Sequence, residues 1–153
     1  MWPRIGYNDS RIEIRPSTTQ GCGLYARADI MKGTLLCTFS GRLLKDRTLL
    51  SENARRYAIR VANTDYVLDC EPPANIEELE STRGWACFAN SDMVAPNARR
   101  DYLPVKTYEK KVLGQPTSPP RMLSDVQPPV LCLVATRFIP ADEEICWNYP
   151  CIF

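Results

Sequence analysis

Short alternations of apolar and polar residues along the chain predict β-strands. The run RIEIR (Arg11–Arg15) alternates charged and apolar positions, which is typical of a strand with one buried face. Apolar residues dominate Gly33–Leu44, where a strand is expected to end at the turn-forming pair Ser40-Gly41. Further along, Ala62–Asp65 separates two apolar runs and contains an Asn, so the pattern there predicts a hairpin.

The rest of the chain adds strands and few helices. Pro128–Pro150 predicts two more strands, divided by the turn PADEE. The best candidate for a helical or irregular stretch is Lys45–Tyr57, and Pro73–Thr82 predicts a short helix. The thirteen prolines argue against a helical bundle, because proline breaks helices. We therefore expect a mainly β (β-rich α+β) fold.

The length of 153 residues is typical of one domain with its own core. Residues 1–153 are accordingly predicted to form a single domain. Composition turns Pro- and Ser-rich at about 111–129 (Lys111–Pro129), which predicts a long mobile surface loop inside that domain.

Charge and hydropathy exclude some classes of function. The net charge is +1, so no overall field draws the chain to nucleic acid or to a membrane surface, and no direct nucleic-acid site is evident. No apolar run is long enough to span a bilayer, and the N-terminal segment lacks the apolar core of a secretory signal. We expect no membrane partner.

The cysteine and histidine content excludes several kinds of catalytic site and metal site. The chain has no histidine, which removes Ser-His-Asp and Cys-His catalysis and every zinc site that contains His. Its seven cysteines are odd in number, scattered and without C-x-x-C spacing, so we expect reduced thiols, no metal, and a nuclear or cytoplasmic location. They are Cys22, Cys37, Cys70, Cys87, Cys132, Cys146 and Cys151.

The stretch QGCGLYA (Gln20–Ala26) raises the question of a nucleotide-binding loop. A dinucleotide-binding fingerprint needs a third glycine that opens a helix, and here Gly33 leads into a strand instead. A phosphate-binding P-loop fails as well, because no Gly-Lys-Ser/Thr follows. Taken alone, the two glycines favour a tight turn between two strands.

Two other stretches give the glycines a context. WACFANSDMVAPNA (Trp85–Ala98) contains an Asn after an apolar run and then a Pro-Asn pair. Alone, it is typical of a helical turn that ends at Asn and is followed by a proline turn. FIPADEEICWNYP (Phe138–Pro150) has an acidic turn and then a strand with Trp147 and Tyr149 on one face. Alone, that pattern is typical of a strand with core aromatics.

In their order along the chain, these blocks resemble the SET domain of protein lysine methyltransferases. The order is Gly-x-Gly-Leu-Tyr-Ala, Ile-x-x-Gly-Thr, aromatic-x-Gly, Phe-x-Asn with a later Pro-Asn, and Glu-Glu-x-x-aromatic-x-Tyr. The resemblance runs from about Ile12 to Tyr149. It implies several small curved sheets and a C-terminal segment that threads under a loop beside the Asn block, forming a pseudoknot.

The resemblance implies an S-adenosylmethionine-dependent transfer of methyl groups to lysine. Asn90 is expected to bond the amino group of the cofactor, the backbone of Ser91 its adenine, and Tyr149 to be the catalytic tyrosine. Trp147 and Phe39 are expected beside the substrate channel. The residues expected at the methionine end of the cofactor are Gly21, Cys22, Gly23, Leu24 and Tyr25.

The sequence also departs from the family pattern. Asn90-Ser91-Asp92 stands where Asn-His-Ser is usual, and the spacing from Asn90 to Pro96-Asn97 is one residue longer. Phe39 replaces a common Tyr, and a Cys-rich segment after the last block, which binds zinc in many members, is not expected here. Two alternatives stay open: a SET-like domain that has lost catalysis and serves as an interaction module, and a plain β-rich binding domain.

The substrate is suggested only by charge. Four acidic residues lie close together in the segment CEPPANIEELE, where they could attract a basic peptide such as a histone tail. A solvated acidic helix explains the same pattern without any partner. The four residues are Glu71, Glu77, Glu78 and Glu80.

Overall fold

A computed structural model describes residues 2–17, 21–45, 49–112, 114 and 128–149. Within these ranges the chain forms a seven-stranded sheet, a three-stranded sheet and one α-helix, with strands predominating. The predicted mainly β class is therefore confirmed. No helix of the described residues is long and apolar enough to cross a membrane.

The larger sheet is built from strands that lie far apart in the sequence. Its central path runs in the order β1 (Ile12–Pro16), β2 (Cys22–Ala26), β10 (Glu144–Trp147), β8 (Ala98–Leu103), β9 (Val130–Ala135) and β3 (Leu35–Thr38), and β7 (Asn90–Ser91) pairs with β10 off this path. β10 is antiparallel to β2 but parallel to β7 and β8. The C-terminal strand thus lies beside the Asn90 block, as the resemblance required, while threading under a loop stays a prediction.

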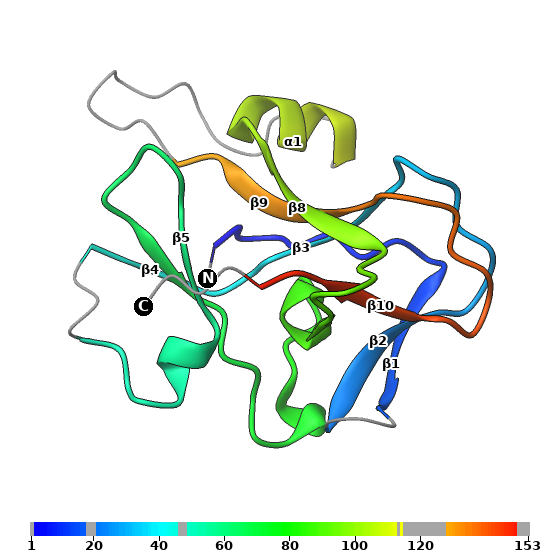
Figure 1. Cartoon of the computed structure of the whole chain (residues 1–153). Helices are drawn as coiled ribbons and strands as arrows, with labels where there is room; N and C mark the ends of the chain where they lie inside the picture. The colour runs from blue at the N-terminus through cyan, green and yellow to red at the C-terminus, as the bar shows by residue number, and fades with distance from the viewer. Residues whose placement is uncertain (1, 18–20, 46–48, 113, 115–127, 150–153) are drawn as a thin grey trace.

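The smaller sheet contains the predicted hairpin. β6 (Val67–Asp69) pairs antiparallel with β4 (Arg42–Leu44) on one side and with β5 (Ala58–Arg60) on the other. The β5–β6 turn includes Asn63 at φ 62°, a left-handed conformation that Asn tolerates better than most residues. Figure 1 places this sheet on the opposite side of the molecule from β1 and β2.

A strand and the α-helix were not expected from the sequence. β8 and α1 (Val105–Val112) follow one another and lie beside β9 (Figure 1). Tyr108 of α1 is buried and donates a hydrogen bond to the carbonyl oxygen of Ile5. β9 is buried along almost its whole length, which explains its continuous apolar sequence.

Both stretches that were predicted to be helical contain short 3₁₀ helices. The described part of Lys45–Tyr57 contains a 3₁₀ turn at Ala54–Arg56, and Pro73–Thr82 contains another at Ile76–Glu78. Each turn is three residues long, too short for an α-helix to nucleate. The loop predicted at about 111–129 falls largely outside the described residues, although residues 111 and 112 belong to α1.

The main core joins both sheets. Its members come from β2, β3, β9 and β10, from the small sheet, and from the turn at Ala86–Phe88. Fully buried large side chains include Phe39, Leu24, Ile30, Leu36, Leu68, Leu131, Leu133, Ile139 and Ile145. This core fixes β10, and β10 in turn positions the site described next.

Candidate functional site

The two glycines of the β1–β2 turn are required for different reasons. Gly21 has φ +49°, in the left-handed region that glycine adopts most readily. A Cβ on Gly23 would lie 2.5 Å from the Glu144 Oε2 atom, so a larger residue would displace that carboxylate from its present position. The stretch is thus a tight turn between two strands, and it also brings its backbone against β10.

The Glu144 carboxylate joins the glycine turn, the Asn block and the last strand. It accepts a hydrogen bond from Asn90 Nδ2 at 2.8 Å and one from the Tyr25 hydroxyl at 3.3 Å. The Ser17 hydroxyl donates to the same carboxylate at 3.2 Å. Asn90 Nδ2 also lies 3.4 Å from the Cys22 carbonyl oxygen, so residues from three separate blocks converge here.

Glu144 was not among the residues predicted for the site. The signal was present in the Glu-Glu pair of the last block, but the sequence did not show which carboxylate would face the glycines. The register of β10 decides this, because Glu144 pairs with Tyr25. Glu143 instead accepts hydrogen bonds from Asn97 and Arg137.

Asn97 holds β10 in this register. Its side chain is buried, its Nδ2 atom donates to the carbonyl oxygen of Glu144 at 2.8 Å and to Glu143 Oε2 at 2.9 Å, and its Oδ1 atom accepts from the Cys146 N–H at 2.9 Å. A side chain that bonds the backbone of the neighbouring strand in this way substitutes for a longer sheet ladder.

The remaining residues predicted at the cofactor end differ in exposure. Cys22 and Ser91 are exposed, whereas Leu24 has an exposed fraction of 0% and belongs to the main core. Tyr25 is buried, with its hydroxyl directed to Glu144. Leu24 could therefore meet a ligand only through its backbone.

Three aromatic residues pack against one another next to this cluster. The Phe39 and Trp147 rings lie 5.2 Å apart edge to face, and the Trp147 and Tyr149 rings lie 4.7 Å apart. The Tyr149 hydroxyl donates a hydrogen bond to the carbonyl oxygen of Ala89, the residue before Asn90. The structure thus brings together the three aromatics that the sequence predicted around a substrate channel.

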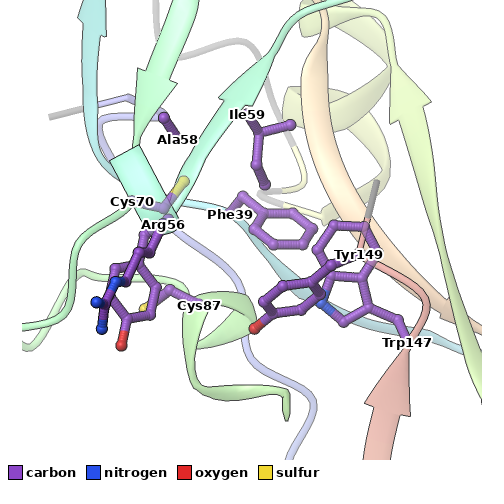
Figure 2. A pocket seen from close by; sticks show the side chains of 9 residues that line it. Phe39, Arg56, Ala58, Ile59, Cys70, Cys87, Trp147 and Tyr149 are labelled. Atoms are coloured by element: carbon purple, nitrogen blue, oxygen red, sulfur yellow. The ribbon is translucent and has the colours of Figure 1, made fainter. Parts of the chain in front are cut away.

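These aromatics line one side of a narrow cavity of about 30 Å³. Figure 2 shows residues of the small sheet and of the Ala86–Phe88 turn on its other side. Its full lining is Phe39, Arg56, Tyr57, Ala58, Ile59, Cys70, Cys87, Trp147 and Tyr149. The sequence did not predict the cavity-lining residues between 56 and 87 as site residues. They reach the cavity only because the small sheet folds against it.

Burial sets the protonation of the groups around this cavity. Desolvation raises the pKa of Tyr149 well above its ordinary value, while the Trp147 indole acts in the opposite direction. Burial also raises the pKa of Cys87 to about 11, and that of Cys70 well above the ordinary thiol value. At neutral pH the tyrosine hydroxyl is therefore a hydrogen-bond donor, and neither thiol is a ready nucleophile.

Among the residues that the structure describes, no group of three His, Cys, Asp or Glu side chains could hold a metal ion. The acidic residues predicted to attract a basic peptide lie on the surface. Glu77, Glu78 and Glu80 are exposed, and Glu71 accepts a hydrogen bond from Asn53 at 2.6 Å.

Comparisons with known proteins agree with this arrangement. The family model described as SET domain matches residues 21–150. A crystal structure from Plasmodium falciparum, described as a candidate histone methyltransferase, superposes with a TM-score of 0.59 at 16% sequence identity. The match covers 95% of this chain and 97% of that one, which shows a shared fold. No curated protein sequence matches the chain.

Proposed function

This chain belongs to the SET-domain family, and from that premise we propose that it is an S-adenosylmethionine-dependent protein lysine N-methyltransferase. The observation that carries the proposal is the convergence on β10. Glu144 contacts Asn90 and sits against Gly23, while Trp147 and Tyr149 of the same segment line the adjoining cavity. This arrangement supports a cofactor site next to a substrate channel.

The residues present fit the amino-acid end of S-adenosylmethionine. That end carries an ammonium group, and the sulfonium beside it is also cationic. The Glu144 carboxylate offers a negative charge, and the Asn90 carboxamide, whose Nδ2 atom bonds Glu144 and Cys22, has Oδ1 as its acceptor end. Gly23 leaves the backbone accessible where a side chain would collide with Glu144.

When bound, S-adenosylmethionine supplies an activated methyl group on its sulfonium, so the protein needs neither a nucleophilic side chain nor a metal. The protein must align the lysine amine with that methyl group. It must also accept the amine without its proton, and deprotonating a free lysine at pH 7 costs roughly 4.6 kcal/mol. The walls from Phe39 and Trp147 lower this cost by desolvation, and the neutral Tyr149 hydroxyl orients the reacting groups.

The experiment that tests this proposal separates binding from transfer. Calorimetry should detect S-adenosylmethionine binding that is unchanged by a chelator, and labelled cofactor should transfer its methyl group to lysine in core histones. Binding without transfer to any protein substrate would favour the interaction module instead. The absence of binding at millimolar cofactor would refute the proposal.

We predict that Asn90→Ala weakens S-adenosylmethionine binding by about tenfold, corresponding to about 1.4 kcal/mol. The substitution removes a carboxamide that orients Glu144 and faces the ammonium group. Calorimetry would measure the change, with Asn53→Ala as a matched control, because Asn53 is exposed and its carboxamide donates to Glu71, away from the proposed site. Equal affinities of Asn90→Ala and the wild type would contradict the role of Asn90.

The number of methyl groups added is expected to follow from the apolar aromatics. Phe39 and Trp147 offer no hydroxyl that would hold a methylated amine in one orientation, so we predict di- or trimethylated products. Mass spectrometry under excess cofactor would identify the product, and Trp147→Tyr should shift it towards monomethylation. If the wild type stopped at one methyl group and Trp147→Phe released the later steps, the bulk of the indole would be the controlling factor.

The substrate and location extend the proposal. Glu77, Glu78 and Glu80 are exposed, and Glu71, which follows the cavity-lining Cys70, is half-buried, so a basic peptide such as a histone tail would meet negative charge along this segment. We further propose a nuclear or cytoplasmic protein with reduced cysteines, organised as one domain over residues 1–153.

A further inference from the structure

A second cavity, of about 310 Å³, lies beyond the end of β10. It is lined by Pro96, Ala98, Arg99, Arg100, Thr136, Trp147 and Asn148. Trp147 is common to this cavity and to the narrow one beside Tyr149, so the two cavities flank the same indole. The second cavity is thus adjacent to the proposed lysine channel.

The register between β8 and β10 determines whether Arg99 or Arg100 lies on the same face of the sheet as Trp147. Trp147 pairs with Ala98 in parallel register, so their side chains lie on one face of the sheet, and Arg100, two residues further, shares that face. Arg99 lies on the opposite face, where its Nη1 atom forms an ion pair with Asp101 at 2.9 Å.

The guanidinium of Arg100 carries one unsatisfied nitrogen in the described part of the chain. Its Nη1 atom is buried and has no hydrogen-bond partner among the residues that the structure describes. The guanidinium stacks over the Tyr102 ring at 5.7 Å, which fixes its plane but leaves its N–H donors unused by that contact. A buried charged donor without an acceptor is costly in a folded protein and points to a ligand that supplies one.

The local charge indicates the kind of ligand. Asp101 neutralises Arg99, so the cavity wall carries one uncompensated positive charge, that of Arg100. One charge matches a carboxylate better than a doubly charged phosphate group. The guanidinium fork also has the geometry to bind both oxygens of a carboxylate.

We propose that Arg100 determines substrate specificity by binding a Glu or Asp side chain that flanks the target lysine. This inference rests on the proposed methyltransferase function. It is separate from the exposed acidic residues Glu77, Glu78 and Glu80, none of which lines this cavity. The preferred peptide would therefore carry an acidic residue beside the target lysine.

Methylation of paired peptides tests the inference. Two sets of lysine-centred peptides would carry either Glu or Gln at each flanking position in turn, and kcat/KM would be measured for each. We expect the wild type to prefer Glu at one position by about tenfold, and Arg100→Gln to lose this preference. Arg27→Gln, which removes an exposed arginine at the end of β2, serves as the control and should retain the preference.

Charge reversal guards against a variant that merely folds poorly. Arg100→Glu should prefer Lys over Gln at the same flanking position, a gain that damage to the fold cannot produce. A wild type without any preference for Glu, or an Arg100→Gln variant that keeps it, would overturn the inference.

Binding measurements separate failure of this inference from failure of the proposed function. Fluorescence anisotropy with the same peptides requires no turnover, so a preference for Glu that depends on Arg100 would stand even if no peptide were methylated. Strong competition by inorganic phosphate, with no difference between Glu and Gln peptides, would instead assign the cavity to a small anion and refute recognition of a peptide.

Discussion

Tyr149→Phe is expected to lower kcat for methyl transfer at least about 100-fold and to change the dissociation constant of S-adenosylmethionine by less than about threefold. The hydroxyl stays protonated, because burial raises the pKa of Tyr149. It donates to the carbonyl oxygen of Ala89 and lies beside the channel wall formed by Trp147. Its contribution is to orient the amine and the methyl group, which affects the reaction barrier more than binding of the ground state.

Single-turnover kinetics with labelled cofactor would measure the rate of transfer, and calorimetry would measure the affinity of the same variant. Tyr66→Phe is the matched control, since it also removes one phenolic hydroxyl but does not line either cavity. A Tyr149→Phe variant with wild-type kcat would show that another group aligns the amine, or that methyl transfer is not the function of the chain.

Asn97→Ala is expected to lower the free energy of unfolding by about 3 kcal/mol. The substitution leaves the partly buried N–H of Cys146 and the carbonyl oxygen of Glu144 without the partner that Asn97 provides. It also removes a hydrogen bond to Glu143. Each unsatisfied buried polar group costs about 1–3 kcal/mol, and two backbone groups are affected at once.

Urea unfolding would measure the loss, with Asn148→Ala as the control, because Asn148 is exposed and lies one residue beyond β10. The dependence of the unfolding free energy on urea should stay the same in both variants, since the buried area hardly changes. A loss below about 1 kcal/mol in Asn97→Ala would mean that water replaces the carboxamide in β10 and that Asn97 does not fix its register.

Local sequence patterns were sufficient to predict the strands and turns whose residues are close together in sequence. The alternation in Arg11–Arg15 located β1, and the Asn in Ala62–Asp65 located the β5–β6 turn. The glycines at 21 and 23 show why a local interpretation can be correct but incomplete. They do form a tight turn, yet the space at Gly23 is used by Glu144, a residue from the far end of the chain.

The site residues that the sequence did not predict depend on pairing between strands that are distant in sequence. Glu144 became a site residue only through its register with Tyr25, and Arg100 lies on the same face of the sheet as Trp147 only because Ala98 pairs with that residue. Nothing local distinguishes Arg99 from Arg100 in β8. A one-residue shift of β10 would exchange which side chains meet, and periodicity cannot fix such a shift between strands so distant in sequence.

The central position of β10 has a consequence for how the molecule is made. Among the described residues β10 comes after every other strand in sequence, yet it lies between β2 and β8. During synthesis the edges of β2 and β8 must therefore wait unpaired until residues 144–147 emerge, and unpaired edges invite aggregation. Pairing between strands this far apart in sequence is slow, because the chain between them must first lose conformational entropy. The nascent chain is thus expected to depend on chaperones until β10 pairs, and the proposed cofactor site to form only after that pairing.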